Sequence, residues 1–269
     1  MKTIMISSIF ALLLGACNIS YGNNTRTLLP AADSTNGFAV VELFTSEGCS
    51  SCPPADELLA RLEKESAGKP LYLLAFHVDY WDHQGWKDSF SQHTFSERQE
   101  AYAHWLHLNS VYTPQVVING TCQYVGSDAG NIIGSINNAF NANKGEHLAL
   151  VGQAANGKVN VSWTLSTPEK HTSLHLAFVQ KNAQSNVRAG ENAGRKLSHV
   201  QIVQQLTTVD PDKNQHATLN IPASFNSRDW ELIGFVQRNS DGKIIAAGKA
   251  TISHPSSYAI NSVSISQKN

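Results

Sequence analysis

The sequence has little charge and almost no imbalance between the two signs. Only 15% of its 269 residues are Asp, Glu, Lys or Arg, and the formal net charge is −1. Proteins that bind nucleic acid or acidic membrane surfaces electrostatically usually gather Lys and Arg in patches. We therefore expect neither a nucleic-acid partner nor a polybasic membrane footprint.

Long hydrophobic runs are also missing. The apolar run Ile4–Leu14, preceded by Lys2, is too short for a stable membrane span and is typical of an export signal. It ends in Leu14-Gly15-Ala16-Cys17, which resembles a bacterial lipobox. We expect a signal segment over 1–16, lipidation of Cys17, and a polar tether over 17–36 that leaves the protein membrane-anchored in the bacterial periplasm. The alternative is an ordinary signal peptide cleaved nearby and a secreted protein.

Cysteine is scarce, with four residues in the chain: Cys17, Cys49, Cys52 and Cys122. That number does not suit a small scaffold held together by disulfides. A second Cys-x-x-Cys pair is absent, which weighs against a four-cysteine zinc site. If Cys17 is lipidated, Cys122 is an odd thiol, either buried and inert or a third redox partner.

The most informative stretch is Phe38–Leu59, in which an apolar strand-like run leads to Cys49 and Cys52 and then to a helix-like segment. A helix N-terminus stabilises a thiolate through its dipole and free N–H groups. This order predicts dithiol–disulfide exchange, with Cys49 as the nucleophile and Cys52 as the resolving thiol, and it requires no organic cofactor. A structural disulfide and part of a metal site are the alternatives.

The segments that follow alternate between strand and helix patterns. The periodicity predicts a β-α-β-α-β-β-α order, with elements over 38–44, 56–67, 70–78, 96–108, 115–119, 122–126 and 128–140. This order is typical of a thioredoxin-like domain, which we expect over 37–144. In that fold the Thr113-Pro114 bond is expected to be cis, with Pro114 against the cysteine pair and Thr113 pairing with a substrate peptide.

The second half has a different pattern, with short alternating strands and the hairpin signals Asn156-Gly157 and Asp241-Gly242. It predicts an all-β, sandwich-like domain over 145–253, followed by a disordered tail over 254–269. The fold class is thus predicted as an α/β thioredoxin-like domain followed by an all-β sandwich-like domain. An insert, Arg188–Leu206, is glycine-rich and charged and then helical in pattern; it is either a functional loop or a loop that seats one domain on the other.

Several motifs together carry a family resemblance: VELFTSEGCSSCPPAD, FHVDYWDHQGWKDSFS, SERQEAYA, VYTPQVVING and RAGENAGRKLSH. They resemble the DUF1223 family, exported bacterial proteins of the thioredoxin-like superfamily that carry the designation of a domain of unknown function. The resemblance implies a thioredoxin-like fold with a β-rich C-terminal extension, a Cys49/Cys52 pair and a Thr113-Pro114 loop. It supplies no substrate.

Other candidate residues surround this pair in the sequence. Glu42, in the apolar strand, is the preferred proton acceptor, ahead of Glu47, for which a solvated turn position is expected. Trp81 is a candidate for a substrate-facing aromatic wall, although packing of its loop is an equal alternative. Histidines cluster between His77 and His107, with His77 expected nearest the site, which leaves copper or zinc handling as a second function. The favoured partners are envelope-protein thiols or disulfides and a redox partner protein.

Overall fold

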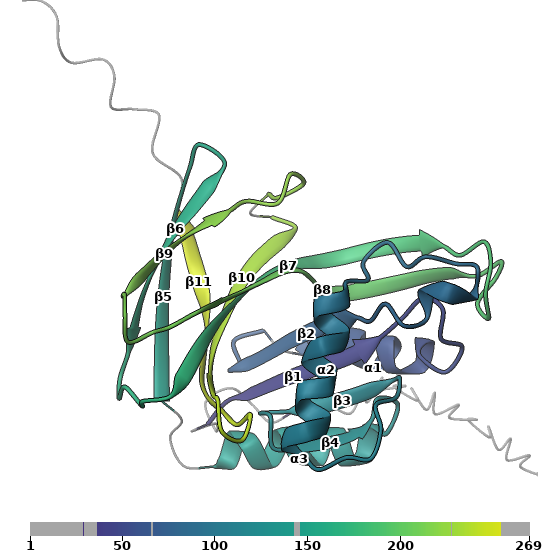
Figure 1. Ribbon diagram of the computed structural model, residues 1–269, viewed down its shortest axis with the longest axis horizontal. Helices are drawn as coiled ribbons and strands as arrows, with labels where there is room; N and C mark the ends of the chain where they lie inside the picture. The colour runs from purple at the N-terminus through teal and green to yellow at the C-terminus, as the bar shows by residue number, and fades with distance from the viewer. Residues whose placement is uncertain (1–28, 30–36, 66, 143–145, 227, 254–269) are drawn as a thin grey trace, which may run out of the picture.

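The computed structural model describes residues 29, 37–65, 67–142, 146–226 and 228–253. These residues form three α-helices, a short 3₁₀ turn and eleven strands (Figure 1). In chain order they are β1 (Ala39–Thr45), α1 (Pro53–Glu65), β2 (Leu71–His77), η2 (Asp82–Gln84), α2 (His93–Trp105), β3 (Gln115–Ile118), β4 (Cys122–Val125), α3 (Ala129–Asn141), β5 (Glu146–Ala155), β6 (Lys158–Leu165), β7 (Thr172–Asn186), β8 (Lys196–Val209), β9 (His216–Asn220), β10 (Trp230–Arg238) and β11 (Ile244–Ser253).

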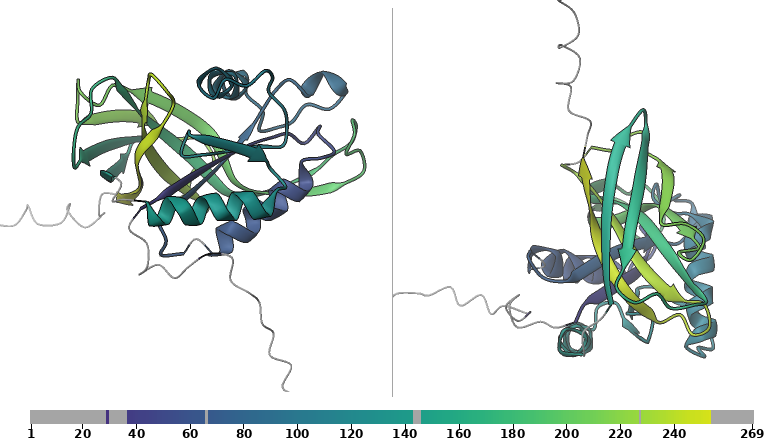
Figure 2. Two further views of the ribbon diagram at one scale, coloured as in Figure 1. Left: turned by 90° about the horizontal axis from the view of Figure 1, so that it is seen from below. Right: turned by 90° about the vertical axis from the view of Figure 1, so that its left-hand side faces the viewer.

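The first half confirms the expected order of elements. β1 and β2 pair in parallel, as a strand–helix–strand unit requires; β3 extends the sheet antiparallel to β1, and β4 pairs antiparallel to β3. Helices α1 and α3 cover one face and α2 covers the other (Figure 2). Alternate residues of β1 serve the two cores: Val41 and Leu43 pack under α1 and α3, whereas Val40 and Phe44 pack under α2.

The predicted fold class, a thioredoxin-like domain followed by a β-sandwich, is wrong. The strands of both halves form one mixed eleven-stranded sheet in the order β4-β3-β1-β2-β8-β7-β10-β11-β5-β6-β9. The halves join where β8 lies parallel to β2, with Ala75 opposite Ile202. The core under α2 crosses this junction, since Phe44 and Phe76 share it with Val203 and Phe235. The error arose because pairing between strands so distant in the sequence leaves no local pattern.

The helix predicted at the end of the 188–206 insert is also wrong, because the segment is the strand β8. Its β-branched residues favour a pleated strand over a helix; they are Val200, Ile202, Val203, Thr207, Thr208 and Val209. β8 pairs along its length with β7, and the insert's remaining residues, 188–195, lie in the loop between the two strands.

The expected hairpins of the second half are confirmed. Asn156 and Gly157 connect β5 to β6 with φ values of 51° and 73°, the left-handed conformation that two-residue hairpin turns require. The turn containing Asp241-Gly242 connects β10 to β11. β5–β7 and β9–β11 surround a third core that includes Phe178, and Figure 1 shows the sheet curving around it.

The expected signal segment, Cys17 and the tail over 254–269 lie outside the described residues, as does the tether except for Leu29. Within the described ranges, no helix has both the length and the hydropathy that a bilayer-spanning helix needs.

Candidate functional site

The site is built around a disulfide at the start of α1. β1 ends at Thr45, a short turn follows, and Cys49 and Cys52 are joined with their Cα atoms 5.5 Å apart. The turn is held by its own backbone: the Cys49 N–H donates to the Ser46 carbonyl at 3.2 Å and the Cys52 N–H donates to the Cys49 carbonyl at 3.2 Å. The expected Cys49–Cys52 pairing is therefore confirmed, and it lies at a helix N-terminus where a thiolate is stabilised.

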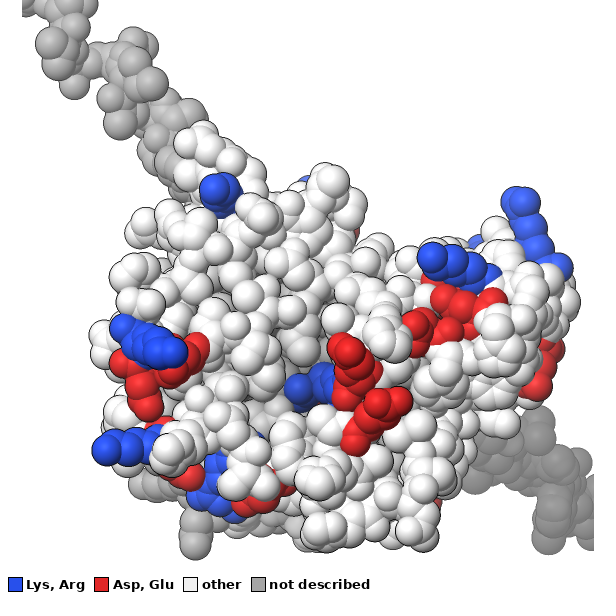
Figure 3. All heavy atoms as spheres, in the orientation of Figure 1, with Lys and Arg blue, Asp and Glu red and all other residues white. Residues whose placement is uncertain are grey.

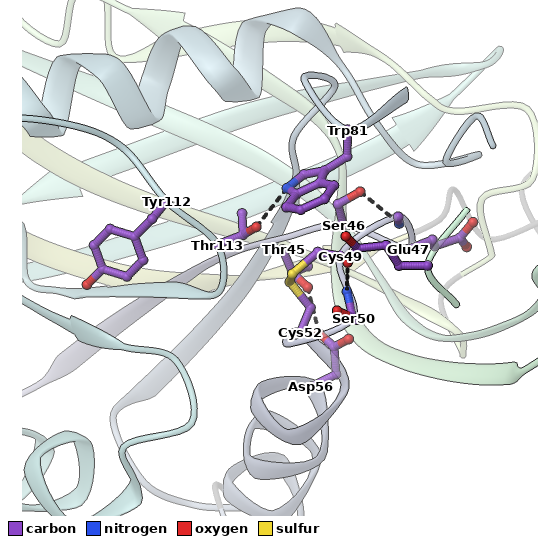
Figure 4. Close-up of a disulfide and its surroundings, with 12 residues drawn as sticks. Thr45, Ser46, Glu47, Cys49, Ser50, Cys52, Asp56, Trp81, Tyr112 and Thr113 are labelled. Carbon is purple, nitrogen blue, oxygen red and sulfur yellow. Dashed lines mark hydrogen bonds between the residues drawn. A yellow bond between two sulfur atoms is a disulfide. The ribbon is translucent and has the colours of Figure 1, made fainter. Parts of the chain in front are cut away.

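The disulfide is covered by residues from distant parts of the chain. Cys49 is 1% exposed and Cys52 is 0% exposed. Figure 4 shows Trp81 beside the disulfide, with its indole Nε1 donating to Thr113 Oγ1 at 2.8 Å. A Cβ atom on Gly48 would lie 3.1 Å from the Trp81 Cβ, so only glycine lets the turn approach this tryptophan so closely. The structure thus brings Trp81 and Thr113 to the disulfide, where they were expected.

The Thr113-Pro114 peptide bond is cis, as expected. Pro114 faces the start of α1 across Gly126, where an added Cβ would lie 2.8 Å from the Pro114 Cβ and 2.9 Å from the Ala55 Cβ. Gly126 is the residue that permits this packing, because any side chain would force the proline and the helix apart.

Glu42 has a structural role rather than the one predicted for it. Its carboxylate accepts hydrogen bonds from Arg98 Nε at 2.6 Å and Nη2 at 3.0 Å, and also from the Tyr102 hydroxyl. Gln237 completes this buried network by donating to the Tyr102 hydroxyl at 2.9 Å. The period-two alternation of β1 directs Glu42 toward α2, while the disulfide lies on the α1 side. A carboxylate bound by arginine on the other face is not available to accept a proton from Cys52.

A different carboxylate lies beside Cys52. Asp56 is one helical turn beyond it, and the Asp56 N–H donates to the Cys52 carbonyl at 3.1 Å, which aligns the two side chains on one helix face. Figure 4 shows Asp56 below the disulfide turn. Burial raises the pKa of Asp56 to about 6, against the opposing effects of His199, His77 and the Thr45 hydroxyl.

Asp56 belongs to a buried cluster of acids and histidines, which we call the acid–histidine cluster. Its members are contributed by five separate segments of the chain: Glu47, Asp56, His77, Asp88 and His199. His77 Nδ1 lies 2.7 Å from Asp88 Oδ2. Although burial lowers the pKa of His77, Asp88 outweighs that effect and the pKa is raised; in turn, His77 holds the pKa of Asp88 below its ordinary value despite burial.

Glu47 belongs to this cluster, which contradicts the solvated position expected for it. It is 0% exposed. Its backbone N–H donates to Asp88 Oδ2 at 2.8 Å, and its Oε2 accepts a hydrogen bond from Trp86 Nε1 at 2.7 Å.

The loop between β7 and β8 reaches the disulfide turn from the second half of the chain. Asn192, itself 0% exposed, donates through Nδ2 to the Glu47 and Cys49 carbonyls, at 2.9 Å each. Glu191 Oε2 accepts the Ser50 N–H at 3.0 Å, and Arg195 Nη1 donates to Asn192 Oδ1 at 2.8 Å. The insert therefore contacts the disulfide turn directly, and sequence reasoning had not singled out Asn192.

Cys122 and the other histidines of the 77–107 segment do not belong to the acid–histidine cluster. His83, His93, His104 and His107 are exposed. Across the described ranges, no three His, Cys, Asp or Glu side chains are arranged to hold a metal ion. Cys122 on β4 lies opposite Ile118 on β3, which lies opposite Val41 on β1. Val41 is four residues before Thr45, where β1 ends and the disulfide turn begins. Cys122 is therefore roughly 13 Å from that turn, measured along the strand direction. It lines a cavity of about 500 Å³ with Ser135 and Arg238 that is separate from the disulfide.

A family model described as "Protein of unknown function (DUF1223)" matches residues 40–237. The chain belongs to the DUF1223 family. Among solved structures, this DUF1223 protein is similar to protein AGR_C_4864 from Agrobacterium tumefaciens, with 28% identity, 78% of this chain and 92% of that chain covered, and a TM-score of 0.59. HBP35 of Porphyromonas gingivalis shares the fold, with 15% identity, 87% and 81% coverage, and a TM-score of 0.57. No curated protein matches the chain.

The matched range includes the disulfide, the acid–histidine cluster and the β7–β8 loop. Sequence reasoning on this DUF1223 chain identified Cys49, Cys52, Trp81, Thr113 and Pro114, all of which lie together. It missed Asp56 and Asp88 as site residues, and it placed His199 in the 188–206 insert, for which a functional loop was one of two alternatives. A signal was present for Asp56, since it follows Cys52 at the helical spacing of four residues.

Proposed function

We propose that this DUF1223 protein is a thiol–disulfide oxidoreductase that acts on a partner protein through Cys49 and Cys52. The observation that carries the proposal is the position of the disulfide at the N-terminus of α1, one turn before the buried Asp56. A structural disulfide needs no proton acceptor, whereas exchange needs one for the resolving thiol. Burying a carboxylate is unfavourable, so its presence beside Cys52 favours a chemical role.

The proposed cycle starts from the dithiol. The Cys49 thiolate attacks one sulfur of a partner disulfide, whose S–S bond breaks, and the departing partner sulfur takes a proton from water. Cys52 then loses its proton to Asp56 and attacks Cys49 Sγ, which breaks the mixed disulfide and releases the second partner sulfur as a thiolate that takes a proton from water. Two electrons pass from the dithiol to the partner, and the reverse sequence oxidises a partner dithiol.

Trapping of the mixed disulfide tests this function. In the Cys52→Ser variant, Cys49 is expected to form a stable adduct with oxidised glutathione that intact-mass measurement detects, because the resolving thiol is gone. The Cys49→Ser variant is the matched control and should form no adduct; both variants also carry Cys122→Ser, which removes the other free thiol of the described chain. Equal labelling of the two variants, or of neither, would refute Cys49 as the nucleophile.

We expect access to Cys49 to depend on the β7–β8 loop, because the cysteine is buried and Asn192 of that loop binds its carbonyl. Replacing Asn192 by alanine removes its two hydrogen bonds to the disulfide turn, worth about 1 kcal/mol each, together with its bond from Arg195. The loss of the two bonds to the turn is expected to make reduction by dithiothreitol roughly thirtyfold faster than in the wild type. Asn182→Ala, on an exposed part of β7, is the control and should leave the rate unchanged. An unchanged rate in Asn192→Ala would mean that this contact does not limit access.

We further propose that the protein is exported and acts in the bacterial periplasm on envelope proteins and a redox partner, with Cys17 as its lipidation site. The support is the N-terminal sequence alone: a short apolar run ending in Leu14-Gly15-Ala16-Cys17. Lys and Arg are scattered on the face shown in Figure 3, which does not suit a nucleic-acid partner. Palmitate labelling that persists in a Cys17→Ser variant would count against lipidation at this residue.

The second candidate is a binding module with a structural disulfide, and the burial of both cysteines favours it, because buried cysteines are usually inert. A copper- or zinc-handling function gains no support from the arrangement of the described histidines.

A further inference from the structure

His199 is the member of the acid–histidine cluster whose position the proposed cycle does not yet explain. It comes from β8, about 150 residues after the disulfide turn in the sequence, and is 2% exposed. Its Nδ1 is 3.7 Å from Asp56 Oδ2, and its Nε2 is 3.5 Å from Glu47 Oε1. The ring therefore bridges two buried carboxylates, one of which lies beside Cys52.

Three polar atoms along this bridge are unpartnered within the described part of the chain: both nitrogens of His199 and Glu47 Oε1. On the Asp56 side, the Thr45 hydroxyl binds Oδ1 at 3.1 Å and leaves Oδ2 to face the histidine. A buried histidine kept only for packing would normally have at least one nitrogen hydrogen-bonded. Separations slightly longer than a hydrogen bond at both ends are compatible with proton-transfer groups at rest, since such contacts often tighten only during the reaction.

Two other rings lie against His199. The His77 ring is 4.9 Å from the His199 ring, between centroids; its Nδ1 is paired with Asp88, and its Nε2 has no hydrogen-bond partner among the described residues. Phe90, at 5.8 Å, closes another side without a titratable group. Asp56 and Glu47 are the groups that place a carboxylate oxygen within 4 Å of a His199 nitrogen, so we take them as the groups that exchange a proton with the ring.

Asp56 and Glu47 are both buried, at 7% and 0% exposed, so a proton taken from Cys52 stays within the acid–histidine cluster until Cys52 leaves as a thiolate and takes it back. Moving that proton from Asp56 to Glu47 frees the carboxylate beside Cys52. An imidazole can accept a proton at one nitrogen while it releases another from the opposite nitrogen, which a single carboxylate cannot do between two sites.

We infer that His199 transfers the proton from Asp56 to Glu47 after Cys52 is deprotonated, and back again when Cys52 leaves as a thiolate. This inference rests on the proposed function. Nδ1 accepts the proton of Asp56 as Nε2 gives its proton to Glu47, so one proton enters and one leaves the ring and no electrons move. His199 acts through Asp56 and does not touch the sulfur chemistry, so it is a positioning and proton-transfer residue.

The experiment follows the two cysteines separately. The reduced protein, in a Cys122→Ser background shared by all variants so that this free thiol does not react, is mixed with an aromatic disulfide whose thiol product is coloured: one equivalent is released when Cys49 attacks and a second when Cys52 resolves the adduct. Both rates are measured from about pH 5 to about pH 9, the range over which a histidine and a raised carboxyl titrate. In His199→Gln, we expect an unchanged first release and a second release slowed about tenfold or more, with a weaker pH dependence.

Two further variants make the result specific. Glu47→Gln keeps an oxygen that can accept the hydrogen bond from Trp86 Nε1, but it can no longer accept a proton from His199. The pH dependence of the second thiol release should therefore weaken in this variant too. Glu47→Gln also tests the inference independently if His199→Gln does not fold. His175→Gln is the matched control. His175 stacks on Phe235. On β7 it is eight residues from Ala183, which lies opposite His199, so His175 is roughly 26 Å from His199 along the strands. It should behave as wild type.

The outcomes separate the two claims. A wild-type protein that releases two equivalents, with folded His199→Gln and Glu47→Gln variants that keep its rates and pH profile, overturns the role of His199 and leaves the oxidoreductase intact. A wild-type protein that releases only one equivalent, or none, overturns the oxidoreductase and this inference with it.

Discussion

Replacing Asp56 by asparagine is expected to stabilise the oxidised protein at neutral pH and at the same time to slow resolution by Cys52. The rise of the Asp56 pKa from 3.8 to about 6 means that the folded state prefers the neutral carboxyl. The stability that the neutral Asp56 carboxyl contributes to the folded state is fully present below about pH 4 and is lost as the pH rises through about 6. A shift of this size corresponds to about 3 kcal/mol, which asparagine, being neutral at every pH, would recover.

Chemical denaturation of the oxidised proteins at two pH values measures this effect. Asp56→Asn and the wild type should have similar unfolding free energies near pH 4, and the variant should be more stable by up to about 3 kcal/mol above pH 6. The second thiol release described for the aromatic disulfide should slow by about a hundredfold. Glu57→Gln, the exposed neighbour on α1, is the control, and its unfolding free energy should change by less than about 0.5 kcal/mol. Equal destabilisation of Asp56→Asn at both pH values would contradict the conclusion that the ionised Asp56 carboxylate destabilises the folded protein.

Replacing Arg98 by alanine is expected to give the largest loss of stability of any single change considered. Arg98 is buried and pairs with Glu42, which is 0% exposed. Without the guanidinium, Glu42 becomes an unpaired buried charge, a change that costs about 3–5 kcal/mol. Thermal or denaturant unfolding at neutral pH measures it directly.

The chain offers a matched surface pair for comparison. Arg238 also binds a glutamate through two nitrogens, Glu169 at 2.6 and 3.1 Å, but both side chains are about a third exposed. Arg238→Ala should therefore cost no more than about 1 kcal/mol. A double variant, Glu42→Gln with Arg98→Met, should lose less stability than Arg98→Ala, because no buried charge is left. Equal losses for Arg98→Ala and Arg238→Ala would contradict the account of Glu42 as a structural residue.

The local elements of the first half could be predicted from the sequence because each has a local cause. The apolar runs give β1 and β2, the spacing of Leu58, Leu59 and Leu62 gives α1, and Asn156-Gly157 gives a hairpin. The continuous sheet could not be predicted in the same way. It depends on the pairing of β2 with β8, which joins Ala75 to Ile202 across more than a hundred residues. Strand pairing of this kind is decided by tertiary packing, and no sequence pattern records it.

The same distinction applies to the site: its residues in local motifs could be predicted, and those brought in by long-range strand pairing could not. Cys49, Cys52 and Thr113-Pro114 were recognised from short motifs. His199 and Asn192 reach the disulfide only because β7 and β8 extend across from the second half (Figure 1). Glu42 was chosen because an acid in an apolar strand is unusual, and it is indeed buried, but its partner Arg98 lies on a helix 56 residues away. A buried carboxylate in a strand is thus as consistent with a buried ion pair as with a catalytic role.

The reduction potential of the Cys49–Cys52 disulfide tests the central claim most directly. It can be measured on the purified protein by equilibration with glutathione buffers. An exchange catalyst is expected to have a potential between about −120 and about −270 mV, in which the dithiol and the disulfide are both accessible. A potential below about −300 mV is typical of a structural disulfide, and it would contradict the assignment of this site to thiol–disulfide exchange.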